Sequence, residues 1–219
     1  MSAARHRAVL FDLDGTLLDT LADIGESMNA ALAELACPAH PVDAYRRFVG
    51  DGMQNLARRV LPPERRDGPT IASCVERVLR IYGSRWDRET HAYPGIEDLL
   101  RELERRCVSL AVLSNKPHDL TRAVVERYFG AHRFAAVAGA RPDAPRKPDP
   151  AGALAIAAAI ECAPGDVLYV GDTDTDMRTA SAAGMVAVGA LWGFRDAEEL
   201  RATGARFLVR TPAEVLALL

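Results

Sequence analysis

The sequence predicts an α/β fold, a doubly wound parallel sheet with a small α-helical cap domain inserted into it. Short apolar, β-branched runs alternate with longer segments of helical period, which is typical of a parallel sheet covered by helices on both faces. Residues 21–91 break this alternation, because they hold several amphipathic helical stretches and no convincing strand.

The alternating part of the chain supplies the expected sheet and its helices. The expected strands are Ala8–Phe11, Val108–Leu113, Phe134–Ala138, Val167–Val170 and Val186–Val188, with Phe207–Val209 as a short edge strand. The expected helices are Ile96–Arg106, Thr121–Phe129, Pro150–Ile160 and Met177–Ala183. Each crossover between parallel strands should be right-handed.

The inserted segment is too long to be a plain crossover connection. Its helical stretches include Ile24–Leu35, Val42–Leu61 and Ile71–Trp86, and the chain returns to the sheet at Tyr93-Pro94-Gly95. We therefore expect a core domain made of residues 1–20 and 92–219, and a cap domain made of residues 21–91.

Composition excludes several classes of protein. Of the 219 residues, 49% are hydrophobic, which is enough for a substantial core. The net charge is −3 and the paired arginines are scattered among acids, so no basic stripe is available to bind nucleic acid. The longest apolar stretch, Leu154 to Ile160, is too short to cross a membrane. The cysteines and histidines lack zinc-ligand spacing. We expect a cytoplasmic protein with neither a nucleic-acid nor a membrane partner.

Two carboxylates stand where the first expected strand ends. The strand runs into Asp12-Leu13-Asp14-Gly15-Thr16, and two acids one residue apart in an extended or tightly turned segment can share a small site. One carboxylate could then attack a substrate while the other transfers protons. The same residues are also compatible with a plain surface turn at Asp14-Gly15.

Polar groups also follow the second expected strand and precede the fourth. The hydroxyl of Ser114 and the backbone near Asn115 could donate hydrogen bonds to phosphate oxygens, although ordinary helix capping is the default interpretation of both residues taken alone. Prolines around Lys147 restrict the chain and could turn this lysine inward, to neutralise a phosphoryl group. A solvated loop lysine is the alternative.

A second acidic group follows the fourth expected strand, in Gly171-Asp172-Thr173-Asp174-Thr175-Asp176. Acids so close repel one another unless a hard cation or hydrogen bonds offset the repulsion, and carboxylate oxygens suit Mg²⁺. If a helix starts near Thr173, Asp176 lies one turn past Asp172 and reaches the same site, whereas Asp174 points away. Capping of that helix is an alternative and compatible role for these acids.

All these segments fall at the carboxyl ends of strands in one sheet, where ligands bind in open α/β folds. Their order, Asp12 to Thr16, Ser114-Asn115, Lys147-Pro148 and Gly171 to Asp176, resembles the four motifs of the haloacid dehalogenase-like (HAD) superfamily of phosphohydrolases. The resemblance spans nearly the whole chain, since the helical insertion is similar to that family's α-helical cap. Residues near Gly184 and the run Trp192 to Arg195 resemble the phosphoglycolate phosphatase branch.

The resemblance implies a role for each acid. Asp12 would be the nucleophile and a Mg²⁺ ligand. Asp14 would be the general acid and base, and would bind the metal through its backbone carbonyl. Asp172 would be the third protein ligand, and Asp176 would support the metal or Lys147.

The same resemblance implies that Ser114, Asn115 and Lys147 hold the phosphoryl oxygens, with Lys147 also restraining the charge of Asp12. The implied substrate is a small phosphorylated metabolite, hydrolysed through an aspartyl-phosphate by a monomer or homodimer. Cap residues Gly50–Gln54, with Arg46 or Arg47, are expected to contact the leaving group.

Alternatives remain within and outside this chemistry. A pyrophosphatase and a phosphosugar mutase of the β-phosphoglucomutase type use the same acids, and no residue excludes either. A catalytically silent binding protein on the same scaffold is a further alternative. Dehalogenation is disfavoured, because family members with that activity lack the second acid and the metal, whereas this chain has Asp14 and the acidic cluster.

Overall fold

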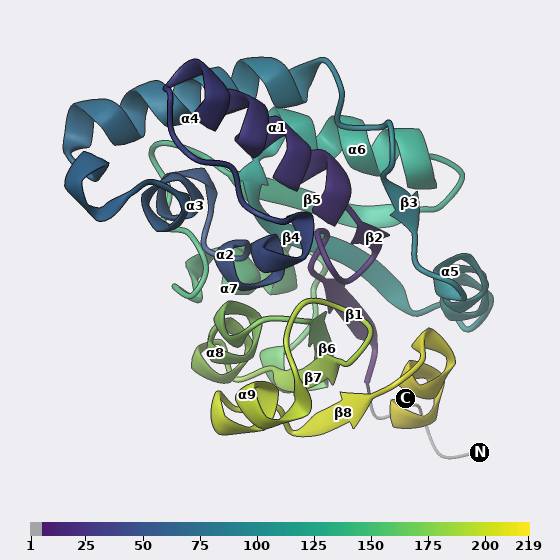
Figure 1. Ribbon diagram of the computed structural model, residues 1–219. Helices are drawn as coiled ribbons and strands as arrows, with labels where there is room; N and C mark the ends of the chain where they lie inside the picture. Colours follow the sequence, from purple (N-terminus) through teal and green to yellow (C-terminus); the bar gives the residue numbers. More distant parts are fainter. Residues whose placement is uncertain (1–5) are drawn as a thin grey trace. The chain divides into compact units, whose positions relative to one another are not determined.

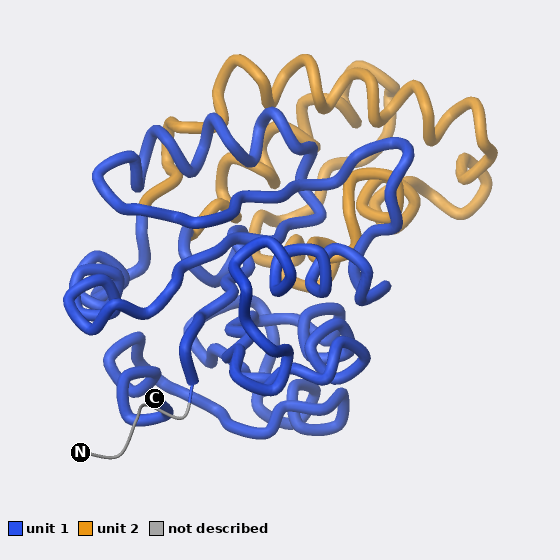
Figure 2. The backbone as a smooth tube through the Cα atoms, turned by 180° about the vertical axis from the view of Figure 1, so that it is seen from behind, with its two compact units in different colours: residues 1–18, 92–219 blue, residues 19–91 orange. Residues whose placement is uncertain are grey.

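The computed structural model describes residues 6–219, which divide into two compact units (Figure 2). The first unit contains the described residues up to Leu18 together with Ala92–Leu219, and the second contains Asp19–His91. Two short strands, β2 (Leu18–Asp19) and β3 (His91–Ala92), form a separate two-stranded sheet. Within residues 6–219, no helix combines the length and apolar character needed to cross a membrane.

The first unit is built on a six-stranded sheet in the order β5-β4-β1-β6-β7-β8 (Figure 1). All neighbouring strands in it run parallel. The strands are β1 (Ala8–Phe11), β4 (Ser109–Pro117), β5 (Phe134–Ala140), β6 (Val167–Gly171), β7 (Val186–Ala190) and β8 (Phe207–Val209). The predicted α/β parallel sheet is confirmed, and β8 is its edge strand.

Helices cover the sheet and bury its apolar strands. They are α5 (Ile96–Arg105), α6 (His118–Phe129), α7 (Ala151–Ala159), α8 (Asp174–Ala182) and α9 (Ala197–Ala202). Residues of α7, α8 and α9 pack against Leu10, Leu113 and Tyr169 in one buried cluster. Helix α5 contacts β4, and α6 contacts both β4 and β5. The residues of β1, β6 and β7 are all buried, as expected for strands of a parallel sheet that helices cover on both faces, whereas the edge strands β5 and β8 are partly exposed.

Two strands differ from their predicted ends in a way that matters for function. The strand predicted to stop at Leu113 continues to Pro117, so Ser114, Asn115 and Lys116 belong to β4 and are buried. Strand β5 likewise continues to Ala140. Apolar patterning identified the centre of each strand, but it carries no signal for the polar end of β4, which is buried within a site.

The second unit is a small helical domain with its own core. Its helices are α1 (Leu21–Glu34), α2 (Tyr45–Phe48), α3 (Met53–Val60) and α4 (Gly68–Gly83). Met28 of α1 and Cys74 of α4 are buried against each other, with their sulfur atoms 3.7 Å apart. The single helical stretch predicted over Val42–Leu61 is broken between Phe48 and Met53, because Gly50 (φ 129°) and Gly52 (φ 83°) adopt positive φ angles that no α-helix contains.

The order of the strands places a site at the end of β1. After β1 the chain builds outward through β4 and β5 on one side, and through β6, β7 and β8 on the other. In open parallel sheets, the crevice where the order reverses lies beyond the carboxyl ends of the strands and binds ligands. Residues that follow β1, β4 and β6 therefore meet in one place.

Candidate active site

Three carboxylates from two distant stretches of chain converge beyond β1 and β6. Asp12 directly follows β1, and its backbone N–H donates to the carbonyl of Val170 at 2.9 Å. Asp172 directly follows β6, and Asp176 lies in the first turn of α8. Carboxylate oxygens of Asp12, Asp172 and Asp176 lie within 4.8 Å of one another, and all three residues are buried.

Close backbone approaches hold Asp172 in this position. A Cβ on Gly193 would lie 2.3 Å from the Asp172 Cβ and 2.5 Å from its Oδ2, so only glycine fits there. Gly15 has a φ of 91°, and a Cβ on it would lie 2.3 Å from the same Oδ2. The hydroxyl of Thr16 donates to Asp172 Oδ1 at 2.7 Å, and the Phe194 N–H donates to Oδ2 at 2.9 Å.

Asp176 is fixed by the helix it caps. Thr173 and Asp176 form a capping box at the start of α8. The Thr173 N–H and hydroxyl donate to Asp176 Oδ2 at 3.0 and 2.6 Å. Asp176 Oδ1 accepts from Lys147 Nζ at 2.7 Å and from the Tyr169 hydroxyl at 3.3 Å. These four donors fill the acceptor sites of the carboxylate, while Asp174 pairs with Arg178 instead.

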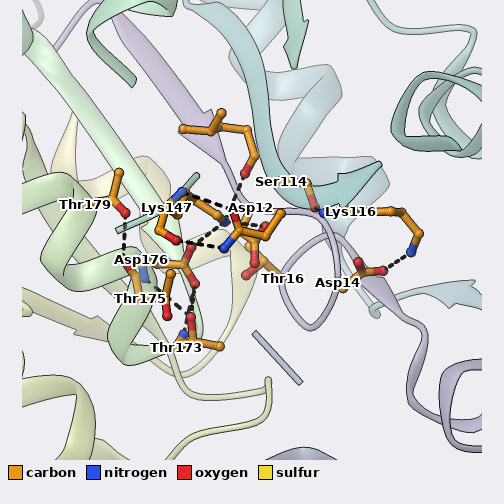
Figure 3. A network of polar contacts seen from close by, with 12 residues as sticks. Asp12, Asp14, Thr16, Ser114, Lys116, Lys147, Thr173, Thr175, Asp176 and Thr179 are labelled. Atoms are coloured by element: carbon orange, nitrogen blue, oxygen red, sulfur yellow. Dashed lines mark hydrogen bonds and ion pairs between the residues drawn. The ribbon is translucent and has the colours of Figure 1, made fainter. Parts of the chain in front are cut away.

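Lys147 lies at the centre of the acidic group (Figure 3). Its side chain is buried, and Nζ donates to Asp12 Oδ1 at 2.8 Å, Asp176 Oδ1 at 2.7 Å and the Leu113 carbonyl at 3.1 Å. The Asn115 side chain accepts from the Lys147 N–H and donates to its carbonyl, both at 3.0 Å. Asn115 thus fixes the backbone from which Lys147 extends.

The local charges shift the acid–base behaviour of these groups. Burial, followed by the charge of Asp176, raises the pKa of Asp12 well above its ordinary value, although Lys147 opposes this. Burial and the charge of Asp176 raise the pKa of Asp172 to about 7, against the hydrogen bond from Thr16. Burial lowers the pKa of Lys147, but Asp12 and Asp176 outweigh burial and the net pKa is raised.

These residues fit a hard divalent cation. Three carboxylates with one ammonium leave an excess of negative charge among the four side chains, and a divalent cation would offset it. Oxygen donors are also the ligands that Mg²⁺ and Ca²⁺ prefer. Asp12 and Asp172 keep unfilled acceptor sites, whereas those of Asp176 are filled by hydrogen bonds.

Asp14 lies beside this cluster rather than in it. Its carboxylate pairs with the ammonium of Lys116, and Figure 3 shows the two side chains meeting on the far side of Ser114 from Asp176. The Ser114 hydroxyl accepts from the Lys116 N–H at 3.2 Å and is buried. The structure therefore brings together Asp12, Lys147, Asp172 and Asp176, and gives the Asp14 side chain a separate partner.

Sequence reasoning assigned no role to Lys116 or Thr16, although Thr16 stands inside the first motif and Lys116 directly follows Ser114-Asn115. A signal for Lys116 was present in the composition. The chain has 27 lysine and arginine residues, of which only Lys116 and Lys147 are lysines, and both are buried against acids of the site. No sequence pattern predicted the hydrogen bond from Thr16 to Asp172.

The chain is similar to known hydrolases over most of its length. The family model described as haloacid dehalogenase-like hydrolase matches residues 9–190. A phosphoglycolate phosphatase from Cereibacter sphaeroides is 37% identical over 179 residues, 81% of each chain. One from Pseudomonas putida is 32% identical over 86% of this chain and 70% of its own length.

Solved structures agree with these sequence matches. The structure of a proposed phosphoglycolate phosphatase from Lactobacillus delbrueckii subsp. bulgaricus superposes with a TM-score of 0.92 at 27% identity, covering 98% of both chains. The family model, the relatives and the solved structure all match the fold that carries the acidic site. The chain belongs to the haloacid dehalogenase-like hydrolase family and is a phosphatase similar to its phosphoglycolate phosphatases.

Proposed function

We propose that this phosphatase hydrolyses a small phosphomonoester of the 2-phosphoglycolate type, with Asp12 as phosphoryl acceptor and Mg²⁺ as cofactor. The observation that carries the proposal is the buried contact of Lys147 with both Asp12 and Asp176, beside Asp172. Such a cluster places an attacking carboxylate next to positive charge, as phosphoryl transfer requires. The names of the relatives support the substrate class.

In the first step, a carboxylate oxygen of Asp12 forms a bond to phosphorus while the bond from phosphorus to the leaving oxygen breaks. Asp14 gives its proton to that leaving oxygen, which departs as an alcohol. The Ser114 hydroxyl donates to a phosphoryl oxygen, while Lys147, whose three hydrogen bonds go to Asp12, Asp176 and the Leu113 carbonyl, offsets the negative charge of the phosphoryl group. Asn115 contributes by fixing the backbone of Lys147.

In the second step, Asp14 takes a proton from water, and the water oxygen bonds to phosphorus. The bond between Asp12 and phosphorus breaks, which returns the carboxylate and releases inorganic phosphate. Lys147 offsets the negative charge of the phosphoryl group in both steps, so the same residues serve each of them.

Asp12 and Asp172 would hold the cation directly, with the backbone carbonyl of Asp14 as a further ligand. Asp176, whose acceptor sites are filled, would support Lys147 and the start of α8 rather than bind the ion. When bound, Mg²⁺ supplies positive charge that lowers the repulsion between the phosphate and the Asp12 carboxylate.

We also propose that residues 21–91 act as the cap domain that selects the leaving group, and that the protein is a cytoplasmic monomer or homodimer. Replacing Gly52 with a bulky residue should change substrate preference or turnover. Light scattering after size-exclusion chromatography measures the oligomeric state, and cell fractionation tests the location.

The test of the proposed function is release of inorganic phosphate from 2-phosphoglycolate, pyrophosphate, hexose phosphates and nucleotides, each with Mg²⁺ and with chelator. We expect Mg²⁺-dependent hydrolysis of 2-phosphoglycolate, and a loss of about 10⁴-fold or more in Asp12→Asn, which lacks the nucleophile. Asp174→Asn is the matched control, because Asp174 pairs with Arg178 outside the cluster. Isomerised sugar phosphate without free phosphate would indicate a mutase, and no turnover of any ester would refute a phosphatase.

A further inference from the structure

Lys116 is an unusual residue in this chain. Of the 27 lysine and arginine residues, all are arginine except Lys116 and Lys147. The side chain of Lys116 is only 4% exposed, and its ammonium pairs with Asp14, which is 14% exposed. An ammonium is costly to bury unless it is paired and hydrogen-bonded, so this lysine reflects a specific requirement at its position.

The backbone of β4 holds Lys116 firmly. Its N–H donates to the Ser114 hydroxyl at 3.2 Å, and its carbonyl accepts from the Thr121 hydroxyl at 3.1 Å. A lysine ammonium is a compact charge on a flexible stem, whereas the planar guanidinium of arginine favours fixed, two-pronged pairing. Lys116 therefore has a fixed base and a mobile charge, which suits an ammonium that exchanges partners.

The ion pair conflicts with the proposed task of Asp14. To transfer a proton to the leaving oxygen, the Asp14 carboxyl group must be protonated and must face that oxygen at hydrogen-bond distance. In the structure it faces Lys116 instead and lies outside the group of acids around Asp12. The carboxylate must be released from Lys116 before it can act, and another anion could release it by taking over the ammonium.

We propose that Lys116 is a positioning and specificity residue that exchanges Asp14 for an anionic group carried by the leaving group of the substrate. This inference rests on the proposed function, because it assumes that Asp14 protonates the leaving oxygen. Asp14 and Lys116 are neighbours, so a leaving oxygen that Asp14 can reach also lies near Lys116. An anionic group that is separated from this oxygen by one methylene would then lie close to the Lys116 ammonium. The preferred substrates are therefore esters such as 2-phosphoglycolate, whose leaving group carries a carboxylate next to the ester carbon.

The kinetic test compares two esters that differ in this carboxylate, 2-phosphoglycolate and ethyl phosphate. We expect the wild type to have a higher kcat/KM for 2-phosphoglycolate than for ethyl phosphate. Lys116→Met should lower kcat/KM for 2-phosphoglycolate at least about tenfold more than kcat/KM for ethyl phosphate, because only 2-phosphoglycolate loses a charge-assisted contact. Lys116→Arg keeps the charge but not the compact ammonium, so it should retain only part of the preference. Arg105→Met is the charge control, because its side chain is 71% exposed on α5 and pairs with Glu102.

The second readout needs no turnover. Protein carrying Asp12→Asn and labelled with [13Cε]lysine has two lysine signals, because the chain has two lysines; Lys116→Arg assigns them. With Mg²⁺ present, 2-phosphoglycolate should shift the Lys116 signal, and ethyl phosphate should shift it far less. Circular dichroism checks that each variant is folded.

The inference would be overturned if Lys116→Met lowered kcat/KM equally for both esters, or if the wild type showed no preference between them. Either result would leave the proposed phosphatase function standing. Equal shifts of the Lys116 signal with both esters would also overturn the inference. If the wild type hydrolysed neither ester nor any other phosphate, the proposed function would fail and the inference would fail with it.

Discussion

Lys147 compensates the charge of the site, since it contacts both Asp12 and Asp176 from a buried position. Lys147→Met keeps a long side chain but removes the ammonium, so the buried carboxylates of Asp12 and Asp176 lose their positively charged partner. Removing one partner of a buried ion pair costs about 3–5 kcal/mol, so we expect the free energy of unfolding in metal-free buffer to fall by about that amount. Urea denaturation followed by circular dichroism measures this change.

The surface variant Arg178→Met is the control for Lys147→Met. Arg178 is 60% exposed and pairs with Asp174 at 3.6 Å, and exposed pairs contribute less than about 1 kcal/mol. Mg²⁺ should restore part of the stability lost in Lys147→Met, because a cation that binds the folded state stabilises it. An unfolding free energy equal to that of the wild type would show that Lys147 does not compensate these acids.

Gly193 sets the position of Asp172 by having no side chain. In Gly193→Ala, the new methyl group would meet the Asp172 side chain at 2.3 Å, so the carboxylate must move. We expect the affinity for Mg²⁺, measured by isothermal titration calorimetry, to fall at least about tenfold, because ligand position determines metal affinity. Gly165→Ala is the control, since nothing lies within 4 Å of its Cβ position. Unchanged affinity in Gly193→Ala would argue against Asp172 as a ligand.

The first turn of α8 links the stability of a helix to the site, because Thr173 caps the helix and also holds Asp176. Thr173→Ala should cost about 1 kcal/mol of stability in urea denaturation, the usual loss for a removed N-cap. Asp196→Ala removes the N-cap of α9 and should cost a similar amount. Only Thr173→Ala should also lower phosphatase activity, because it removes one of the four hydrogen bonds that hold Asp176. Equal activity in the two variants would contradict this link.

His132 connects helix α5 to the turn that follows α6. Its ring nitrogens lie 2.9 Å from carboxylate oxygens of Glu104 and Glu97. Burial lowers the pKa of His132, but hydrogen bonds and charges from these two glutamates outweigh burial and the net pKa is raised. The stabilisation is therefore fully present below the ordinary pKa of 6.5 and is lost as the pH rises through the higher pKa of the folded state.

His132→Gln should remove this pH dependence. We expect the wild type to lose more stability than His132→Gln between about pH 6 and about pH 8.5, the range in which a raised histidine pKa falls. Urea denaturation at both pH values measures the difference. His91→Gln, which changes an exposed histidine, is the control and should follow the wild type. A parallel pH dependence in His132→Gln would refute the role of His132.

Much of the fold of the whole molecule could be predicted from hydrophobic periodicity. β1 and β8 match their predicted ranges, because apolar runs bounded by polar turns mark strands clearly. The extension of β4 to Pro117 could not be predicted, since Ser114, Asn115 and Lys116 are polar and are buried among the polar residues of the site rather than in the apolar core. The break in Val42–Leu61 depends on the φ angles of two glycines, which periodicity does not record.

The candidate site was partly predictable for a related reason. Residues that directly follow strands, such as Asp12 and Asp172, are placed by the sheet itself, and strand order brings them together. The partners of flexible side chains are set by tertiary contacts. The pairing of Lys116 with Asp14 and the anchoring of Lys147 by Asn115 are contacts between segments far apart in the chain, so local patterns could not show them.

Trapping of the phosphorylated enzyme tests the central claim, that Asp12 receives the phosphoryl group. Wild-type protein turning over 2-phosphoglycolate with Mg²⁺ is quenched in acid, and borohydride reduces an aspartyl-phosphate to homoserine, which mass spectrometry locates in the peptide. We predict homoserine at position 12, in amounts that depend on substrate and Mg²⁺. Phosphate release accompanied by a phosphorylated or reduced residue elsewhere, with residue 12 unmodified, would contradict the account.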